Sequence, residues 1–218
     1  MTAPRLVRID IVSDIVCPWC AIGLAALEQA LARTADAVTP DIAFHPLELN
    51  PGLPPEGERL ADNMARKYGA SPDQARAAGG RIRDAAAEAG VDMSGRGDRI
   101  YDTHDAHRLL HWAGTLGQQL ALKRTLLEAY FARGENVSDH AVLVAAAERA
   151  GLDGATARAV LTDGRYADEV EQAEAHWRGE GILSVPTIIL DGRFVIPGAQ
   201  SPERLEKALR RRVEPASA

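Results

Sequence analysis

The chain has 218 residues, enough for one large domain or for a domain with a sizeable insertion. Its formal net charge is −6 at pH 7, which argues against a nucleic-acid partner because such proteins usually present a basic surface. No apolar run is long enough to span a bilayer, and no signal sequence precedes the first predicted strand. We therefore expect a cytoplasmic protein without a membrane partner.

The first element is a strand over residues 5–12, where polar and aliphatic side chains partly alternate. From Ala21 to about Thr34, apolar residues recur every three or four positions, which predicts an amphipathic helix. The segment Cys17-Pro18-Trp19-Cys20 lies between the two. Both cysteines therefore fall where a strand gives way to the first turn of a helix.

This position favours thiol chemistry at Cys17. The first turn of a helix has unpaired N–H groups and a partial positive charge, and both favour a thiolate over a thiol. Pro18 suits the first helical position because it lacks an N–H and its φ is already close to helical. Cys20, one turn further in, is expected to be the less acidic and less exposed sulfur. Two thiols at this spacing can close a disulfide, so we predict a redox pair.

Other interpretations of the pair are weaker. A zinc site needs further ligands, and the sequence has only these two cysteines, so histidines or carboxylates from elsewhere would have to complete it. A structural disulfide across so short a loop removes little chain entropy and is rare outside oxidising compartments. The spacing therefore favours a redox pair in a turn between a strand and a helix.

The next elements complete a βαβ unit. Residues 42–45 are interpreted as a second strand, after a turn predicted at residues 39–41. A right-handed crossover through the first helix would make the two strands parallel. The proline-rich segment after Pro46 suits neither a helix nor a strand, so we interpret it as a linker.

The middle of the chain is predicted to be helical. Ser71 followed by Pro72 is typical of a helix start, whereas Gly79 and Gly80 indicate close packing or a break inside the helix that follows. The predicted helices cover residues 60–68, 72–90, 103–113, 118–131, 138–150, 153–162 and 166–180.

The end of the chain returns to strands. Residues 182–190 and 193–196 are apolar runs on either side of Asp191-Gly192, a pair suited to the positive φ angles of a type I′ turn, so a β-hairpin is predicted. A last helix is expected over residues 203–212. The residues after Glu214 are expected to be disordered.

Together these elements describe an α/β chain with the thioredoxin fold, a βαβ unit followed by a ββα unit, with a large all-helical insertion between them. Cys17-Pro18-Trp19-Cys20 and Ser184-Val185-Pro186-Thr187 strongly resemble the motifs of the DsbA-like thiol oxidoreductases, in particular their FrnE-like branch. The resemblance extends over nearly the whole chain. It implies a thioredoxin-like domain from residues 1–50 and 181–214, an inserted helical domain at residues 51–180, and a tail at residues 215–218.

The resemblance also implies a cis peptide bond at Val185-Pro186, in a loop beside the cysteines. Proline is the residue for which the cis form costs least, and its missing N–H leaves the neighbouring backbone free to pair with an extended substrate. The catalytic residues implied are Cys17 and Cys20, and the substrate-binding residues implied are Pro18, Trp19, Val185, Pro186 and Thr187.

In the implied reaction, Cys17, whose sulfur is expected to be exposed, forms a mixed disulfide with the substrate, and Cys20 resolves it. Trp19 stands where the periplasmic DsbA proteins have a histidine. A neutral indole cannot supply the positive charge or the hydrogen bonding of that histidine, so we predict a less oxidising pair. The indole instead offers an apolar platform beside Cys17.

Three histidines, His104, His107 and His111, have helical spacing and could share one face. A metal site is one interpretation, but amphipathic or capping histidines are commoner, so no metal is predicted. We expect this helix instead to pack over the active-site side and to shape substrate access, as the inserted domain does in the family.

Two other functions remain open. Glutathione-dependent kappa-class transferases and hydroxychromene-carboxylate isomerases look similar in layout, but they usually have serine or another single nucleophile at the position of Cys17. A binding or chaperone-like protein with a vestigial pair is the third interpretation. The presence of both cysteines favours a redox reaction with a thiol- or disulfide-bearing protein or small molecule. We expect no tightly bound cofactor, glutathione as a redox partner or co-substrate where one is used, and a monomer or homodimer.

Overall fold

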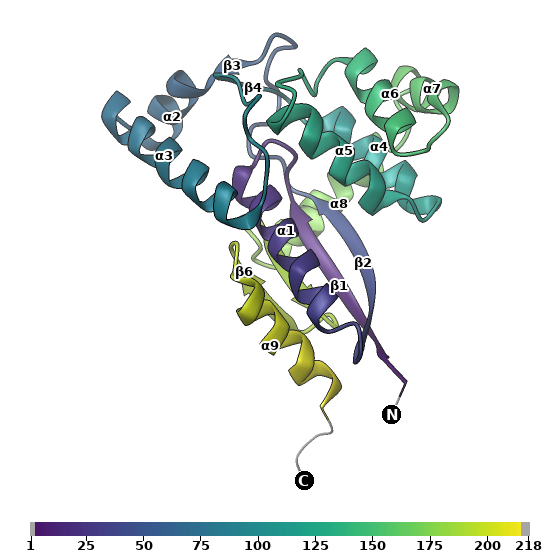
Figure 1. Cartoon of the computed structure of the whole chain (residues 1–218). Helices are drawn as coiled ribbons and strands as arrows, with labels where there is room; N and C mark the ends of the chain where they lie inside the picture. The colour runs from purple at the N-terminus through teal and green to yellow at the C-terminus, as the bar shows by residue number, and fades with distance from the viewer. Residues whose placement is uncertain (1–2, 215–218) are drawn as a thin grey trace.

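The computed structural model describes residues 3–214, so the predicted tail at residues 215–218 lies outside the described part of the chain. The central sheet has the strand order β2-β1-β5-β6 (Figure 1). Its strands are β1 (Arg5–Ser13), β2 (Val38–Pro46), β5 (Thr187–Leu190) and β6 (Phe194–Pro197). β1 runs parallel to β2 and antiparallel to β5, which forms a hairpin with β6. The predicted thioredoxin-like arrangement is confirmed.

Three helices cover this sheet: α1 (Pro18–Arg33), α8 (Ala167–Gly179) and α9 (Pro202–Val213). α1 packs beside α9, and Ile11 of β1 lies in the apolar core that these two helices share. The next residue, Val12, belongs to a second apolar cluster with Trp177 of α8. Because successive side chains of a strand point to opposite faces, α8 covers the face opposite to α1 and α9.

The other helices form an insertion between β2 and β5: α2 (Leu60–Tyr68), α3 (Pro72–Ala89), α4 (His104–Thr115), α5 (Gln119–Phe131), α6 (His140–Arg149) and α7 (Gly154–Thr162). They lie at one end of the molecule, with α2 and α3 as an arm on one side and α4 to α7 on the other (Figure 1). A short antiparallel pair, β3 (Glu58–Arg59) with β4 (Arg99–Ile100), was not predicted. Within the described residues, no helix has both the length and the apolar character needed to cross a membrane.

The start of α3 follows the prediction. The Ser71 hydroxyl accepts the N–H of Gln74, and the Gln74 side chain accepts the N–H of Ser71, which makes a reciprocal cap. The expectation of a break or of close packing at Gly79 and Gly80 is wrong. α3 is continuous there, and a Cβ at either position would meet only the side chain of Arg83, at 3.6 and 4.0 Å.

Two strand boundaries differ from the prediction. The turn expected at residues 39–41 is part of β2. Pro40 fits there because β2 is an edge strand, where a missing N–H need not interrupt the ladder. At the other end of the chain, residues 182–186 are not in a strand, and β5 begins only at Thr187. Pro186, just before it, has no N–H to donate to the sheet.

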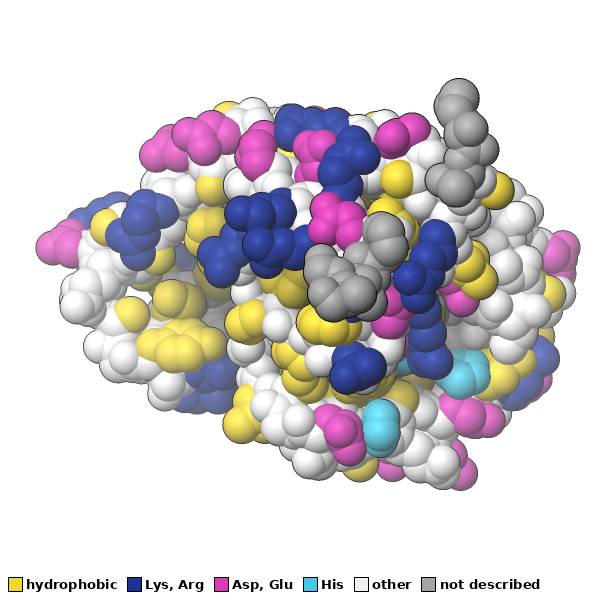
Figure 2. All heavy atoms as spheres, turned by 90° about the horizontal axis from the view of Figure 1, so that it is seen from below, with side chains coloured by type: hydrophobic (Ala, Val, Ile, Leu, Met, Phe, Trp, Pro, Cys, Tyr) yellow, Lys and Arg dark blue, Asp and Glu magenta, His cyan; other side chains and the backbone are white. Residues whose placement is uncertain are grey.

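The end of the molecule away from the insertion carries interspersed charges of both signs (Figure 2). The last turn of α9 contributes to them. Arg210 pairs with Glu206 at 3.1 Å and with Asp36 at 3.5 Å, and the guanidinium of Arg212 lies 3.5 Å from the centroid of the Phe194 ring. These arginines therefore make contacts within the chain and match the negative end of the helix dipole.

Candidate active site

The turn between β1 and α1 holds both cysteines. Cys17 is the N-cap of α1, with extended backbone angles (φ −84°, ψ 114°), and Pro18 is the first helical residue. The N–H of Cys20 donates to the carbonyl oxygen of Cys17 at 3.0 Å, so the two cysteines share one helical turn. They are not bridged in this structure. The predicted position of the pair at a helix N-terminus is confirmed.

Both sulfurs lie beneath the surface. The exposed fraction is 4% for Cys17 and 3% for Cys20. The expectation that Cys17 is the exposed sulfur is therefore wrong. The proline loop, residues 184–187, lies against it: Sγ of Cys17 is 3.8 Å from the carbonyl oxygen of Val185. A substrate disulfide thus needs a local opening beside this loop to reach Cys17.

The acidities of the two thiols differ in the predicted direction. A hydrogen bond from the Cys20 thiol lowers the pKa of Cys17, and the N–H groups of Cys20 and Trp19 add to this against the effect of burial. Burial raises the pKa of Cys20 well above its ordinary value, and its bond to Cys17 raises it further. The pair therefore favours a thiolate on Cys17 and a thiol on Cys20.

The proline loop packs directly on α1. The Val185–Pro186 peptide bond is cis, as the resemblance implies. Gly23 makes room for the proline ring, because a Cβ at that position would lie 3.1 Å from Cγ of Pro186. The carbonyl oxygen of Pro186 accepts the N–H of Gly198 at 2.8 Å, which ties the loop to the segment after β6. These contacts hold the loop beside Cys17.

The remaining predicted binding residues differ in their exposure. Trp19 is 40% exposed and Pro18 is half-buried. Thr187 is buried, and its hydroxyl donates to the carbonyl oxygen of Ser184 at 2.8 Å, so its side chain shapes the loop rather than facing solvent. Trp19 also borders a groove of about 400 Å³ between α1, α3 and the start of α9, whose lining includes Ala85, Ala89, Ala199 and Gln200.

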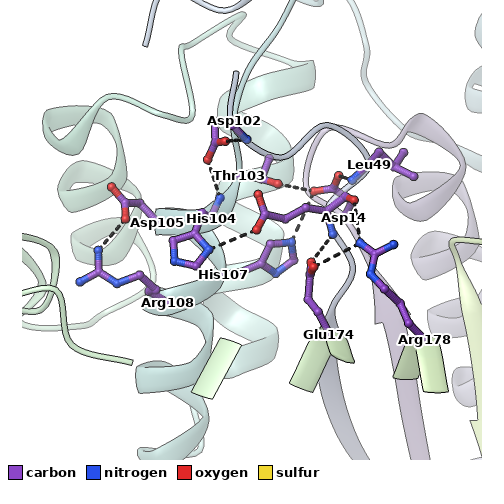
Figure 3. Close-up of polar contacts among 12 residues, drawn as sticks. Asp14, Leu49, Asp102, Thr103, His104, Asp105, His107, Arg108, Glu174 and Arg178 are labelled. Atoms are coloured by element: carbon purple, nitrogen blue, oxygen red, sulfur yellow. Dashed lines mark hydrogen bonds and ion pairs between the residues drawn. The ribbon is translucent and has the colours of Figure 1, made fainter. Parts of the chain in front are cut away.

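A buried carboxylate, Asp14, lies just before the active-site turn, and sequence reasoning gave it no role. It is fully buried. Its Oδ1 accepts the hydroxyl of Thr103 at 2.8 Å and lies 3.4 Å from Nε2 of His107, and its Oδ2 accepts the N–H of Leu49 at 2.8 Å (Figure 3). Burial by itself would raise the pKa of Asp14, but these hydrogen bonds, led by that of His107, bring it below its ordinary value.

The three histidines of α4 serve separate contacts. His107 is buried against Asp14, His104 lies 3.1 Å from a carboxylate oxygen of Glu48, and His111 stacks on the tyrosine that precedes α8. In the described part of the chain, no group of three or more His, Cys, Asp or Glu side chains could hold a metal ion. His107 of α4 packs against Asp14 on the buried side of the active-site turn, as expected of this helix, and its role in substrate access stays a prediction.

Sequence reasoning also passed over Lys123 of α5, which is only 1% exposed. The sequence does contain a sign that both residues are buried. Asp14 precedes an apolar pair in the chain, and Lys123 stands among leucines on a predicted helix. Charged side chains are seldom fully buried unless they are paired. A charge inside an apolar run is therefore the pattern that could have found them.

Comparisons with known proteins bear on this site. The sequence matches the family described as "DSBA-like thioredoxin domain" over residues 8–210. Uncharacterized protein YwbO of Bacillus subtilis (strain 168) is 30% identical to this chain over 205 residues, which cover 93% of this chain and 96% of YwbO.

Solved structures give the same fold. The protein described as "probable DsbA oxidoreductase SCO1869" from Streptomyces coelicolor is 37% identical, with a TM-score of 0.85 over 94% of this chain and 89% of that chain. A 2-hydroxychromene-2-carboxylate isomerase is 13% identical, with a TM-score of 0.69 over 94% of this chain and 95% of that chain, a likeness of fold alone. The FrnE-like branch stays a prediction. The chain belongs to the DsbA-like thioredoxin-domain family and is a DsbA-like thiol oxidoreductase with a Cys17–Cys20 pair.

Proposed function

We propose that the chain exchanges disulfides through a mixed disulfide at Cys17, which Cys20 resolves. The observation that carries this proposal is the place of the two thiols on one helical turn: Cys17 is the N-cap of α1, and the N–H of Cys20 donates to its carbonyl oxygen at 3.0 Å. The directions of the pKa shifts agree with it, because the hydrogen bond from Cys20 lowers the pKa of Cys17 and burial raises that of Cys20. The thiolate, not the thiol, attacks a disulfide. Cys17 therefore reacts first and Cys20 second.

In the reductive direction, the Cys17 thiolate attacks a substrate disulfide. A bond forms between Sγ of Cys17 and one substrate sulfur, and the other substrate sulfur leaves as a thiolate and takes up a proton. Cys20 then attacks Sγ of Cys17, closes the internal disulfide and releases the second substrate thiol. Two electrons pass from the pair to the substrate, and the reduction potential of the pair decides whether this sequence or its reverse runs.

We assign substrate contact to the residues around the pair. The proline loop suits an extended substrate, because Val185 and Pro186 lie beside Cys17 and a proline leaves the adjoining backbone free to pair. Pro18 and the exposed indole of Trp19 follow Cys17 at the surface, and the buried Thr187 holds the shape of the loop. Glutathione in the cytoplasm is the redox partner or co-substrate that we propose.

Trapping tests this order of events. Cys20→Ser retains the nucleophile but cannot resolve an adduct, whereas Cys17→Ser removes the nucleophile. After incubation with glutathione disulfide or a disulfide-bonded peptide, Cys20→Ser is expected to gain the mass of one substrate half, and Cys17→Ser is expected to gain none. An adduct that forms on Cys17→Ser but not on Cys20→Ser would reverse the proposed roles.

Glutathione-dependent isomerisation is the alternative, because an isomerase of 2-hydroxychromene-2-carboxylate shares this fold. That reaction does not need the closure of a disulfide between two cysteines. Loss of all activity in Cys17→Ser fits the redox function. Glutathione-dependent isomerisation of 2-hydroxychromene-2-carboxylate that survives in Cys17→Ser fits the alternative.

A further inference from the structure

Lys123 is buried without a hydrogen-bonding partner. Its side chain is 1% exposed, and among the described residues none accepts a hydrogen bond from its Nζ. The ammonium lies 5.6 Å from the centroid of the Phe44 ring, which offers only a weak cation–π contact in exchange for lost water. An isolated buried ammonium is strongly unfavourable and tends to lose its proton, so Lys123 stays charged only if negative charge lies close to it.

The face of α5 that carries Lys123 is turned toward the cysteine-bearing end of α1. One turn earlier, the side-chain amide of Gln119 bonds the N–H and the carbonyl oxygen of Phe44 in β2, at 2.8 and 2.9 Å. One turn later, Leu127 lines the same surface depression as Ala21 of α1. Residues four apart share one face of a helix, so Lys123 lies between the edge strand and the first turns of α1.

Three ionisable groups act on this ammonium: the thiols of Cys17 and Cys20 and the carboxylate of Asp14, which itself bonds His107. Burial lowers the pKa of Lys123 below its ordinary value, and negative charge on these three groups opposes that fall without cancelling it. The effect is reciprocal. Burial and the Cys17 thiolate raise the pKa of Cys20, and the ammonium of Lys123 opposes that rise.

We propose that Lys123 is a buried counter-charge that stabilises the thiolate of Cys20 while that sulfur reacts. The inference rests on the proposed function, because it concerns the second step of that reaction. In the mixed disulfide, Cys17 is uncharged and Cys20 must ionise at a buried position. A fixed ammonium nearby lowers the free energy of that ionisation, since opposite charges interact strongly where water is excluded.

The same charge serves both directions of exchange. In reduction, Cys20 loses its proton to solvent and attacks Sγ of Cys17; the Cys17–Cys20 bond forms, the bond to the substrate breaks, and the departing thiolate takes up a proton. In oxidation, a substrate thiolate attacks Sγ of Cys17 in the internal disulfide, and Cys20 leaves as a thiolate. Negative charge therefore develops on Cys20 in either direction, where Lys123 can stabilise it.

The direct test measures the pKa of Cys20 in a Cys17→Ala background, from the ultraviolet absorbance of the thiolate as a function of pH. Lys123→Met removes the charge and keeps a long apolar side chain. It is expected to raise the pKa of Cys20 by about one unit or more, which is a ~10-fold smaller thiolate fraction at a fixed pH. Lys123→Arg keeps the charge and is expected to raise it less.

Arg124→Met is the matched control, because it deletes the neighbouring cation of α5. Arg124 pairs with Glu28 of α1 at 2.6 Å on the surface, where solvent screens its charge. This variant is expected to leave the pKa of Cys20 unmoved. A shift of the same size as that of Lys123→Met would mean that any cation of α5 acts on Cys20, which would overturn the inference.

Kinetics in the chain with both cysteines give a second readout. Lys123→Met is expected to slow the resolution of the mixed disulfide about threefold for each unit of raised Cys20 pKa. The loss is smaller than the tenfold fall in thiolate because a more basic thiolate is also a better nucleophile. An unchanged rate of resolution, with an unchanged pKa of Cys20, would overturn the inference.

Stability measurements in urea distinguish a role of Lys123 in the ionisation of Cys20 from a purely structural role. Replacing a buried charge by an apolar side chain of similar size is often neutral or stabilising, so Lys123→Met is expected to be at least as stable in urea as the wild type. A less stable variant with an unmoved Cys20 pKa would show that Lys123 is structural. A Cys20→Ser chain that traps no mixed disulfide would instead overturn the proposed function, while the Cys17→Ala comparison would still report on Lys123.

Discussion

The pKa of Cys17 is lowered from its ordinary value, first by the hydrogen bond from the Cys20 thiol and then by the N–H groups at the start of α1, against the effect of burial. Trp19 contributes its N–H to this set, but its indole carries no charge and is 40% exposed. The reduced state of the pair is therefore stabilised by dipoles and hydrogen bonds at this turn. A positively charged side chain in the place of the indole would stabilise the reduced state further.

Trp19→His is expected to make the pair more oxidising. An imidazolium at this position would favour the Cys17 thiolate, and a tenfold stabilisation of the reduced form raises the reduction potential by about 30 mV. Equilibration with glutathione redox buffers measures this shift. Trp19→Phe keeps an uncharged ring and is the control. An equal shift in both variants would show that loss of the indole, not gain of charge, is responsible.

Asp14→Asn is expected to destabilise the fold by about 1–3 kcal/mol, because the amide N–H₂ of asparagine would face hydrogen-bond donors that now meet a carboxylate. The donors include the N–H of Leu49 and the hydroxyl of Thr103. Urea unfolding at neutral pH measures the change. The surface variant Asp168→Asn is a control that should stay within a few tenths of a kcal/mol. Equal stability of Asp14→Asn and wild type would contradict the account.

The same carboxylate makes stability depend on pH. The pKa of Asp14 in the folded protein lies below its ordinary value, of about 3.9 in an unfolded chain. Folding therefore favours the ionised form. Its contribution is complete above the unfolded pKa and is lost as the pH falls through the lower folded pKa. In acid titrations of the urea midpoint, wild type is expected to lose more stability than Asp14→Asn does.

Short motifs made part of the site predictable. The cysteine pair and the proline loop could be found because their chemistry depends on adjacent residues. Asp14 and Lys123 could not be assigned in the same way. Their burial arises from segments far apart in the chain: Asp14 meets Leu49 and α4, and Lys123 of α5 lies beside Phe44 of β2.

α5 closes the free edge of the sheet. The amide of Gln119 bonds both backbone groups of Phe44, on the side of β2 that has no neighbouring strand among the described residues. An edge strand with open N–H and C=O groups is prone to pair with other chains. The insertion thus caps the edge strand at Phe44 and also packs against Asp14 beside the active-site turn.

Gln119→Ala is expected to lower the free energy of unfolding by about 1–3 kcal/mol, because it leaves two partly buried backbone groups of Phe44 without these bonds. Urea unfolding checks this value. Gln118→Ala, at the exposed neighbouring residue, is the control and should change stability little. A similar loss in both variants would indicate an effect of helix propensity rather than of the sheet edge.

Elements that depend on local signals were predicted well. Helix starts such as that of α3 follow from a cap that spans three residues, Ser71 to Gln74. Strands were predicted less well because they depend on pairing. Pro40 fits β2 because no strand of the described residues pairs on that side. Residues 182–186 look like a strand in sequence but lead into the loop beside Cys17. β3 and β4 are two residues each and too short for a periodic signal.

At the scale of the whole molecule, the insertion and the thioredoxin-like part share the surface beside the cysteines. The groove next to Trp19 has one wall from α3 and another from α1 and the start of α9. A substrate longer than a few atoms that reaches Cys17 from this side would contact both parts. The arm of α2 and α3 is thus placed to affect substrate choice (Figure 1).

Ala85→Trp is expected to fill much of this groove of about 400 Å³ and to raise the KM for a disulfide-bonded peptide several-fold more than that for a small aromatic disulfide. Steady-state kinetics with the two substrates measure the ratio. Ala87→Trp, on an exposed face of the same helix, is the matched control. Equal effects of Ala85→Trp on both substrates would mean that peptides do not bind along this groove.

Equilibrating the chain in graded glutathione redox buffers and trapping the free thiols shows whether Cys17 and Cys20 form one redox couple. One couple gives a single reversible transition in which both thiols disappear together, and a mixed disulfide is expected to accumulate only in Cys20→Ser. A pair that stays reduced in the most oxidising buffer, or thiols that titrate independently, would rule out a redox couple.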